Sequence, residues 1–403
     1  MRATNSTGRR APEASGGARG CHWAGLWWGA ALAAMLVGAL AGCQSLQLDR
    51  PLAAPEATPE ATAPAPMPPL VQAWRRDAEA AFGPEAPVAT ADGRIALGTR
   101  DGKVMVLDAR TGSREGVGDF DDSVEGGLAA RGPLVFVPLA KSRAGLVGHD
   151  VLRASRAWAL GGGPHLAAPA IVGATLVAGA HDGTARGLDP TTGEVLWEAR
   201  PDTSAQIRAG VVAAGPPGGP LAVVSDTEGV VRAYRPRTGV LAWTARVGAP
   251  IYRTPTASGA LVIVPTTRGR LVALDAATGA ERWAVQTGAA VRWATPEATP
   301  TAVFAGATDG TLRALDPETG RERWAMTFDG GIGGKPLAAE GVVYVGTYGE
   351  RVIGVDAETG AVVWEHEVSG RVRAGLVASG GTLVVLAEPR FVYGFRPQPL
   401  ATR

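Results

Sequence analysis

A ten-residue pattern, Leu-Asp-x-x-Thr-Gly-x-x-x-Trp, recurs along most of this 403-residue chain. Its copies end, in chain order, at Trp158, Trp197, Trp243, Trp283, Trp324 and Trp364. An earlier copy has Gly116 where the tryptophan is expected, and Trp74 lies one further interval upstream. These positions are 39 to 46 residues apart, and of the tryptophans after residue 43 only Trp293 falls outside the register. The chain is therefore a repeat protein with units of about 40 residues.

Each unit also contains short apolar runs bounded by turn signals. An Asp-Gly pair follows such a run in several units, at Asp101-Gly102, Asp182-Gly183 and Asp309-Gly310. Glycine tolerates the positive φ that a tight hairpin turn demands, so these pairs predict β-hairpins. In the long pattern, the Asp and Thr side chains can hydrogen-bond the backbone of a second turn, in which the glycine supplies another positive φ. We expect four short strands per unit and no helix of ten or more residues.

A four-stranded sheet of this length cannot bury both of its apolar faces alone, whereas radial stacking buries them and places each tryptophan between neighbouring sheets. The sequence therefore predicts an all-β fold, an eight-bladed β-propeller over residues 70–403. The expected docking residues are Trp74, Trp158, Trp197, Trp243, Trp283, Trp324 and Trp364. The strand that carries Trp74 is expected to complete the eighth blade, because closure leaves no exposed strand edge. A seven-bladed ring is the alternative, but it leaves Trp74 unexplained.

The first 43 residues have the pattern of an export signal. Four arginines in the first 19 residues precede an uncharged apolar run from Trp23 to Gly42. The ending Leu40-Ala41-Gly42-Cys43 resembles the bacterial lipobox, which implies that residues 1–42 are a signal peptide and that Cys43 is lipidated. An uncleaved transmembrane helix is the alternative, since the run is about 20 residues long.

Residues 43–69 are expected to form a lipidated cysteine followed by a tether. The segment is rich in Ala and Pro, and such a composition gives a semi-rigid spacer rather than a core. In the sorting rule that this signal resembles, an Asp after the cysteine retains a lipoprotein in the inner membrane. Gln44 stands there instead, which favours a lipid-anchored protein of the outer membrane on its periplasmic side.

Composition excludes several classes of function. The formal net charge is +1, from 39 basic and 38 acidic residues, which does not support nucleic-acid binding. Both cysteines, Cys21 and Cys43, precede the predicted propeller, so it contains no disulfide, cysteine nucleophile or cysteine metal site. The histidines form no short-spaced ligand pair. We therefore expect no catalytic residue, no metal and no cofactor.

The motif Ala-x-Asp-x-x-Thr-Gly-x-x-x-Trp, at Ala273–Trp283 and Ala314–Trp324, resembles the tryptophan-docking repeat of quinoprotein-type propellers. With the lipobox, the Pro-rich tether, eight units and no cysteine in the propeller, the chain resembles the BamB family. BamB is the lipoprotein subunit of the machine that inserts β-barrels into the bacterial outer membrane. The resemblance implies a non-enzymatic scaffold that binds the periplasmic modules of the barrel-forming subunit.

Two other functions stay open. One is a propeller lipoprotein that contacts cell wall, polysaccharide or another envelope protein. The other is a quinoprotein dehydrogenase holding pyrroloquinoline quinone and Ca²⁺, which would need a carboxylate base and hard oxygen ligands for the cation.

A basic residue recurs nine to eleven positions after the motif tryptophan, where the chain crosses to the next blade. These residues are Arg208, Arg253, Arg292, Lys335 and Arg373. We expect them to surround one mouth of the central channel, on the face that carries the Asp-Gly turns, and to bind the partner because arginine is favoured at interfaces. The alternative is a set of solvated arginines that only keeps a narrow channel wet.

Ile207 is expected to join this partner-binding set. The segment Ile207-Arg208-Ala-Gly210 resembles the Leu-Arg-Gly segment with which BamB proteins contact their partner. The next blade departs from the family, since Ile251-Tyr252-Arg253 stands where acidic residues are usual.

The lipid anchor has a direct test. Replacing Cys43 by Ala should give an exported protein without acyl label, because the other cysteine of the segment, Cys21, does not follow a lipobox-like sequence. Metabolic labelling with a fatty acid, followed by detergent-phase partition, measures this. A labelled Cys43→Ala variant in the detergent phase would contradict the assignment.

Overall fold

The computed structural model describes residues 46–48 and 66–398, apart from 84, 86, 91, 142–144, 202–203 and 216–218. Residues 1–42 and Cys43, predicted as signal peptide and lipidation site, lie outside this part of the chain. The described residues form 33 strands and no helix. Within them, therefore, no helix is long and apolar enough to cross a membrane.

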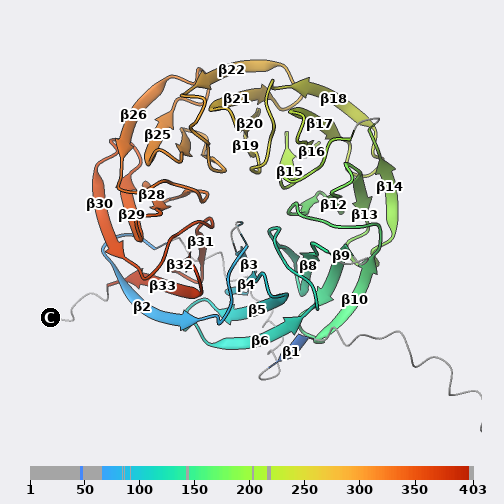
Figure 1. Ribbon diagram of the computed structural model, residues 1–403, viewed down its shortest axis with the longest axis horizontal. Coiled ribbons are helices and arrows are strands. Elements are labelled where there is room, and N and C mark those ends of the chain that lie inside the picture. Colours follow the sequence, from blue (N-terminus) through green and yellow to red (C-terminus); the bar gives the residue numbers. More distant parts are fainter. Residues whose placement is uncertain are drawn as a thin grey trace, which may run out of the picture. The chain divides into compact units, whose positions relative to one another are not determined.

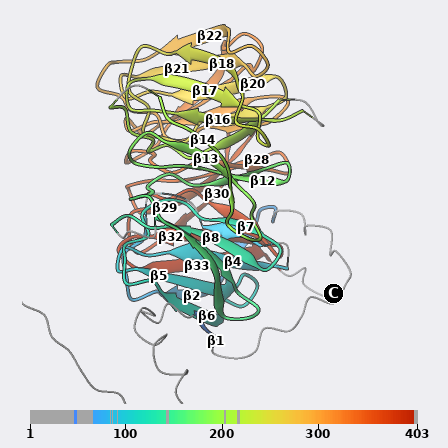
Figure 2. The ribbon, with the colours of Figure 1, turned by 90° about the vertical axis from the view of Figure 1, so that its right-hand side faces the viewer.

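The strands form eight antiparallel sheets that follow one another around a ring (Figure 1), seen edge-on in Figure 2. The first four blades contain β3 (Val88–Ala89), β4 (Arg94–Gly98), β5 (Lys103–Asp108), β6 (Arg114–Asp119); β7 (Ala129–Arg131), β8 (Leu134–Pro138), β9 (Leu146–Asp150), β10 (Ser155–Leu160); β11 (Ala170–Val172), β12 (Thr175–Gly179), β13 (Ala185–Leu188), β14 (Val195–Ala199); β15 (Val212–Ala214), β16 (Leu221–Ser225), β17 (Val230–Tyr234) and β18 (Leu241–Arg246).

The remaining blades have the same meander order. They contain β19 (Thr256–Ser258), β20 (Leu261–Pro265), β21 (Arg270–Asp275), β22 (Glu281–Gln286); β23 (Glu297–Ala298), β24 (Val303–Gly306), β25 (Thr311–Leu315), β26 (Glu322–Thr327); β27 (Leu337–Ala339), β28 (Val342–Gly346), β29 (Arg351–Asp356), β30 (Val362–Glu367); β31 (Val377–Ser379), β32 (Thr382–Ala387), β33 (Phe391–Pro397) and β2 (Leu70–Asp77). The prediction of an eight-bladed β-propeller is confirmed.

The eighth blade is closed by the N-terminal strand, as predicted. Strand β2 pairs antiparallel with β33, with Leu70 opposite Pro397 and Asp77 opposite Phe391. The backbone oxygen of Leu70 also accepts a hydrogen bond of 2.9 Å from the indole of Trp364 in the seventh blade. Residues about 300 positions apart in sequence are thus joined in one sheet, and the ring has no open seam at this blade.

The repeated tryptophans lie between blades. Each indole N–H donates to a backbone oxygen of the following blade, in the pairs Trp74–Ala109, Trp158–Pro190, Trp197–Pro236, Trp243–Ala276, Trp283–Pro317, Trp324–Ala357 and Trp364–Leu70. Each indole ring also packs on the glycine of the Thr-Gly turn in the following blade. A Cβ added to Gly279, whose φ is +73°, would lie 2.5 Å from Trp243 Cε3. Glycine is required there for its conformation and for the close approach.

The Asp and Thr of the long motif stabilise this turn as predicted. The carboxylate of Asp275 accepts hydrogen bonds from the backbone N–H of Ala277 and from both the N–H and the hydroxyl of Thr278. These bonds and the Arg282 guanidinium hold the pKa of Asp275 below its ordinary value. The acidic motif residue therefore has a structural role.

Between the first and second blades, both halves of the docking interaction are missing. Gly116 replaces the tryptophan of the first blade, and Ala154 replaces the glycine in the turn of the second. Ala154 still adopts the positive φ of that turn, +51°. An alanine is tolerated there because no indole packs on its Cβ. The missing tryptophan of the first blade and the missing glycine of the second therefore affect the same contact between blades.

The same first blade has a fifth strand, which comes from the segment predicted as a tether and was not expected from the sequence. Strand β1 (Leu46–Leu48) pairs antiparallel with β6, with Leu48 opposite Gly116. An outer strand offers unpaired backbone donors and acceptors, and a short neighbouring segment can satisfy them. Three residues in a Pro- and Ala-rich segment are too few for a period-two pattern to predict a strand.

His149 of β9 occupies a core position at this same interface. Other units have an apolar residue at the equivalent place, such as Leu188 or Leu274. The side chain is 2% exposed, it lies edge-on to Phe120 at 5.5 Å, and neither ring nitrogen has a hydrogen-bond partner in the described part of the chain. Burial lowers the pKa of His149 to about 4, although the nearby negative charge of Asp150 acts to raise it.

This histidine predicts acid sensitivity. In the unfolded chain it binds a proton as the pH falls through about 6.5, whereas the folded chain resists protonation down to about 4, so folding stability is lost across that window. This shift of the His149 pKa corresponds to a loss of roughly 3 kcal/mol in the free energy of unfolding. His149→Leu should therefore unfold at higher urea concentration, with an advantage over the parent that grows between pH 6.5 and pH 4. Parallel pH profiles for the two proteins would contradict this account.

Candidate functional site

In two of the loops that enter blades, an apolar residue and a basic residue stand side by side. Ile207 packs against Gly179 at the end of β12, where an added Cβ would lie 2.3 Å from Ile207 Cγ2. Val372 packs in the same way against Gly346 at the end of β28. In both loops the next residue, Arg208 or Arg373, is then directed out of the core. The position of these two basic residues thus has a geometric origin.

Ile207 itself does not belong to the exposed surface. Its side chain is 3% exposed and lies in the core cluster with Val177, Ala185 and Trp197. The prediction that Ile207 contacts a partner stays a prediction, and in the structure its side chain fills the core. Its neighbour Arg208 is exposed.

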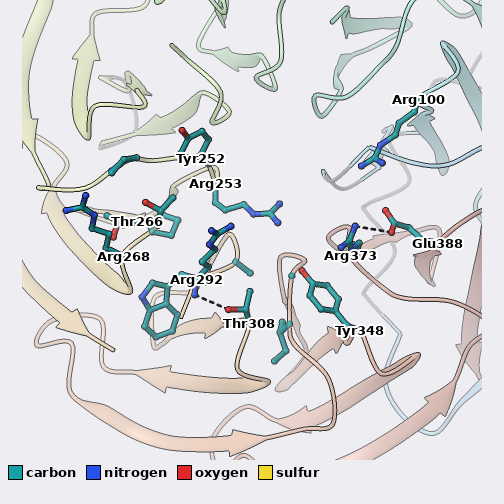
Figure 3. Close-up of a pocket in the computed structure, with 17 residues that line it drawn as sticks. Arg100, Tyr252, Arg253, Thr266, Arg268, Arg292, Thr308, Tyr348, Arg373 and Glu388 are labelled. Atoms are coloured by element: carbon teal, nitrogen blue, oxygen red, sulfur yellow. Dashed lines mark hydrogen bonds and ion pairs between the residues drawn. The ribbon is translucent and has the colours of Figure 1, made fainter. Parts of the chain in front are cut away.

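Three of the five predicted basic residues meet in one cavity of about 840 Å³. Arg253, Arg292 and Arg373 line it, together with two arginines from hairpin turns, Arg100 and Arg268. Figure 3 shows the guanidinium groups of Arg253 and Arg292 extending toward the open centre of the cavity. Arg373 and Arg100 lie across that centre, while Arg268 lies at the margin.

Backbone hydrogen bonds fix the entry loops beside the hairpin turns. The N–H of Thr308, next to the Asp309-Gly310 turn, donates to the backbone oxygen of Arg292 at 3.0 Å, and the Thr308 hydroxyl accepts from the N–H of Arg292. Thr267 makes the equivalent backbone bond to Pro250. The arginines and the turns therefore lie on the same face of the propeller, and the arginines are held by rigid elements.

The arginines differ in how they are held. Arg373 forms an ion pair with Glu388 at 3.5 Å and lies over the ring of Tyr348 at 5.4 Å. Its Nε atom is buried and has no hydrogen-bond partner among the described residues. By contrast, within the same part of the chain, Arg253 and Arg292 have neither an ion pair nor a side-chain hydrogen bond to their guanidinium groups. These two positive charges thus lack a direct counter-charge among the described residues, as do those of Arg100 and Arg268.

Arg208 and Lys335 lie next to this cavity. The guanidinium of Arg208 is 5.9 Å from the ring of Tyr252, a cavity residue that is 45% exposed. Lys335 lines an adjoining cavity of about 330 Å³ that Arg253 also borders. Its ammonium forms an ion pair of 2.5 Å with Glu297. Lys335 is therefore neutralised, whereas Arg253 is not.

Glu85 is the carboxylate that faces Arg253 in this second cavity. Burial raises the pKa of Glu85, and the nearby positive charges of Arg253 and Lys335 only partly oppose that effect, as does a hydrogen bond from Thr254. The carboxylate is thus poorly stabilised in its charged form.

Sequence reasoning missed Arg100, Arg268, Tyr252, Tyr348 and Trp293, all of which line the main cavity. A signal for the first two exists, because Arg100 precedes the Asp101-Gly102 turn and Arg268 precedes Gly269. Trp293, the one tryptophan after residue 43 that falls outside the repeat register, is 2% exposed in the cavity wall. A tryptophan outside the register was therefore a sequence signal for this part of the wall.

The chemistry that these residues offer is anion binding. The cavity wall contains five arginines and, among the described residues, a single carboxylate, Glu388. A concave wall of one sign of charge focuses the electrostatic field on its mouth. The described part of the chain contains no group of three His, Cys, Asp or Glu side chains that could hold a metal ion.

Comparisons with known structures place this geometry in a common fold. BamB from Moraxella catarrhalis is 20% identical with a TM-score of 0.65, covering 81% of this chain and 99% of that one. The computationally designed protein Ika8 is 18% identical with a TM-score of 0.68, covering 80% and 98%. Quinohemoprotein alcohol dehydrogenase ADHIIG from Pseudomonas putida HK5 is 17% identical with a TM-score of 0.65, covering 83% and 78%. At these identities the likeness establishes the fold alone.

A search of the curated proteins finds no match to the chain. A family model described as outer membrane protein assembly factor BamB matches residues 71–210, 181–328 and 308–397. These segments overlap and cover all eight blades, including the closing strand β2. The chain therefore belongs to the family of the outer membrane protein assembly factor BamB.

Proposed function

We propose that this protein is a non-enzymatic scaffold of the outer-membrane β-barrel assembly machinery. It binds the periplasmic modules of the barrel-forming subunit, and a lipid on Cys43 anchors it in the outer membrane on the periplasmic side. Family membership supports the role, and the lipobox-like ending Leu40–Cys43 supports the anchor. The propeller supplies a rigid docking surface in this function.

The observation that carries the docking surface is the pair Arg253 and Arg292, whose charges have no direct counter-charge among the described residues. A partner that supplies carboxylates would replace water around these groups with charge-assisted hydrogen bonds. Tyr252 and Arg208 extend the same surface outward. Tyrosine and arginine are the residue types most enriched at energetically important interface positions.

The quinoprotein neighbours raise a second possibility, which the residues of the cavity do not fit. Such chemistry needs a carboxylate base and several oxygen ligands for a cation. Glu388, the one carboxylate among the described cavity residues, forms an ion pair with Arg373. A wall with five arginines disfavours a divalent cation electrostatically.

The docking surface predicts a specific effect of charge reversal. Arg208→Glu and Arg253→Glu, each alone and together, should weaken binding to the purified periplasmic modules of the barrel-forming subunit. The double variant should lose about tenfold or more in affinity at low salt, and the difference should shrink at high salt because screening weakens exposed charge contacts. Surface plasmon resonance with the full-length chain measures this.

Arg237→Glu is the matched control, because it makes the same charge change at an exposed residue of the turn between β17 and β18 in the fourth blade. It should bind as the parent does. A folded double variant that binds as tightly as the parent at low salt would contradict the proposed docking surface.

A further inference from the structure

The main cavity contains more positive charge than its surroundings require. The whole chain has a formal net charge of only +1, yet five arginines and one carboxylate line this single space. Like charges repel each other in a concave, partly desolvated site, so such a cluster lowers stability unless a bound anion compensates for it. The cluster therefore indicates a ligand.

The arrangement of the arginines identifies the form of that ligand. Arg253, Arg292 and Arg373 enter from the loops before β19, β23 and β31, and Arg100 enters from the hairpin between β4 and β5. Arg253 and Arg292 extend toward the open centre of the cavity from one side, and Arg373 and Arg100 lie across that centre (Figure 3). A ligand with several separated carboxylates could pair with arginines on both sides of the centre.

The walls between the arginines are aromatic. Tyr252 and Tyr348 line the same cavity with accessible rings, Tyr252 is 45% exposed at its rim, and Trp293 is buried behind them in the wall. Such surfaces pack against the methylene groups and the backbone of a peptide, while the guanidinium groups bind carboxylates in a planar, two-bonded geometry. The volume of about 840 Å³ is in the range of sites that enclose a drug-sized ligand or a few residues of a chain.

We propose that the cavity binds an acidic peptide segment of a partner protein, with Arg253 and Arg292 as the pair that receives its carboxylates. Arg373 is held in position by Glu388 and Tyr348. Tyr252 packs against the segment where it leaves the rim. This inference rests on the proposed scaffold function and specifies the chemistry of the partner at the docking surface.

The test uses the full-length chain and a fluorescent synthetic peptide that alternates Glu with Gly and Ser. Fluorescence anisotropy should report binding that falls steadily with rising salt. A counterpart with Gln in place of every Glu should not bind. Arg253→Gln combined with Arg292→Gln should reduce the affinity by at least about tenfold. The control Arg237→Gln should leave it unchanged, and thermal unfolding should verify that all variants are folded.

Three results would overturn the inference. The Gln peptide could bind as well as the Glu peptide, the Arg253/Arg292 variant could bind like the parent, or citrate could bind tightly where the Glu peptide does not. The last result would identify a small polycarboxylate as the ligand instead.

The same protein is also tested against the periplasmic modules of the barrel-forming subunit. Modules that bind while the peptide does not would leave the scaffold function standing and remove this inference. If the peptide binds and the modules do not, the inference of an acidic-peptide site would stand and the proposed scaffold function would be contradicted.

Discussion

The pairing of β2 with β33 joins two ends of the folded chain that lie about 300 residues apart. In the other blades the four regular strands form a local meander, in which each strand pairs with a neighbour in sequence, and the first blade adds β1 beside β6. Local meanders alone would leave the ring open between its last and first units. The closing pair, with the Trp364 indole bonded to Leu70, turns a linear repeat into a ring.

Ring closure also determines the geometry of the candidate site. The arginines of the main cavity come from the first, fifth, sixth and eighth blades or the loops that lead into them. Such distant segments share one cavity only because the blades close around a common axis (Figure 1). In two entry loops an apolar residue, Ile207 or Val372, fills the core, and the basic residue that follows it lies outside the core. Basic residues from several entry loops and hairpin turns thus meet in the main cavity.

The sequence predicts the parts of the fold that depend on short-range chemistry. The Asp-Thr-Gly turn, the hairpin glycines, the blade number and the closing strand all follow from spacing and from turn residues. Strand β1 could not be predicted, because its pairing depends on an edge that only the folded first blade creates. The burial of Ile207 could not be predicted, because spacing alone does not distinguish a core residue from its exposed neighbour Arg208. Arg100 and Arg268 join the site through tertiary structure, although their positions beside hairpin turns were visible.

The central claim, that an N-terminal strand closes the ring, has one direct measurement. Two deletions of similar length are compared by urea unfolding: one removes residues 70–77, which form β2, and the other removes residues 50–57 upstream of it. The account predicts a large fall in midpoint for the first, because it exposes the edge of β33 and removes the acceptor of the Trp364 indole. The second should unfold close to the parent. Equal midpoints for the two deletions would contradict closure by β2.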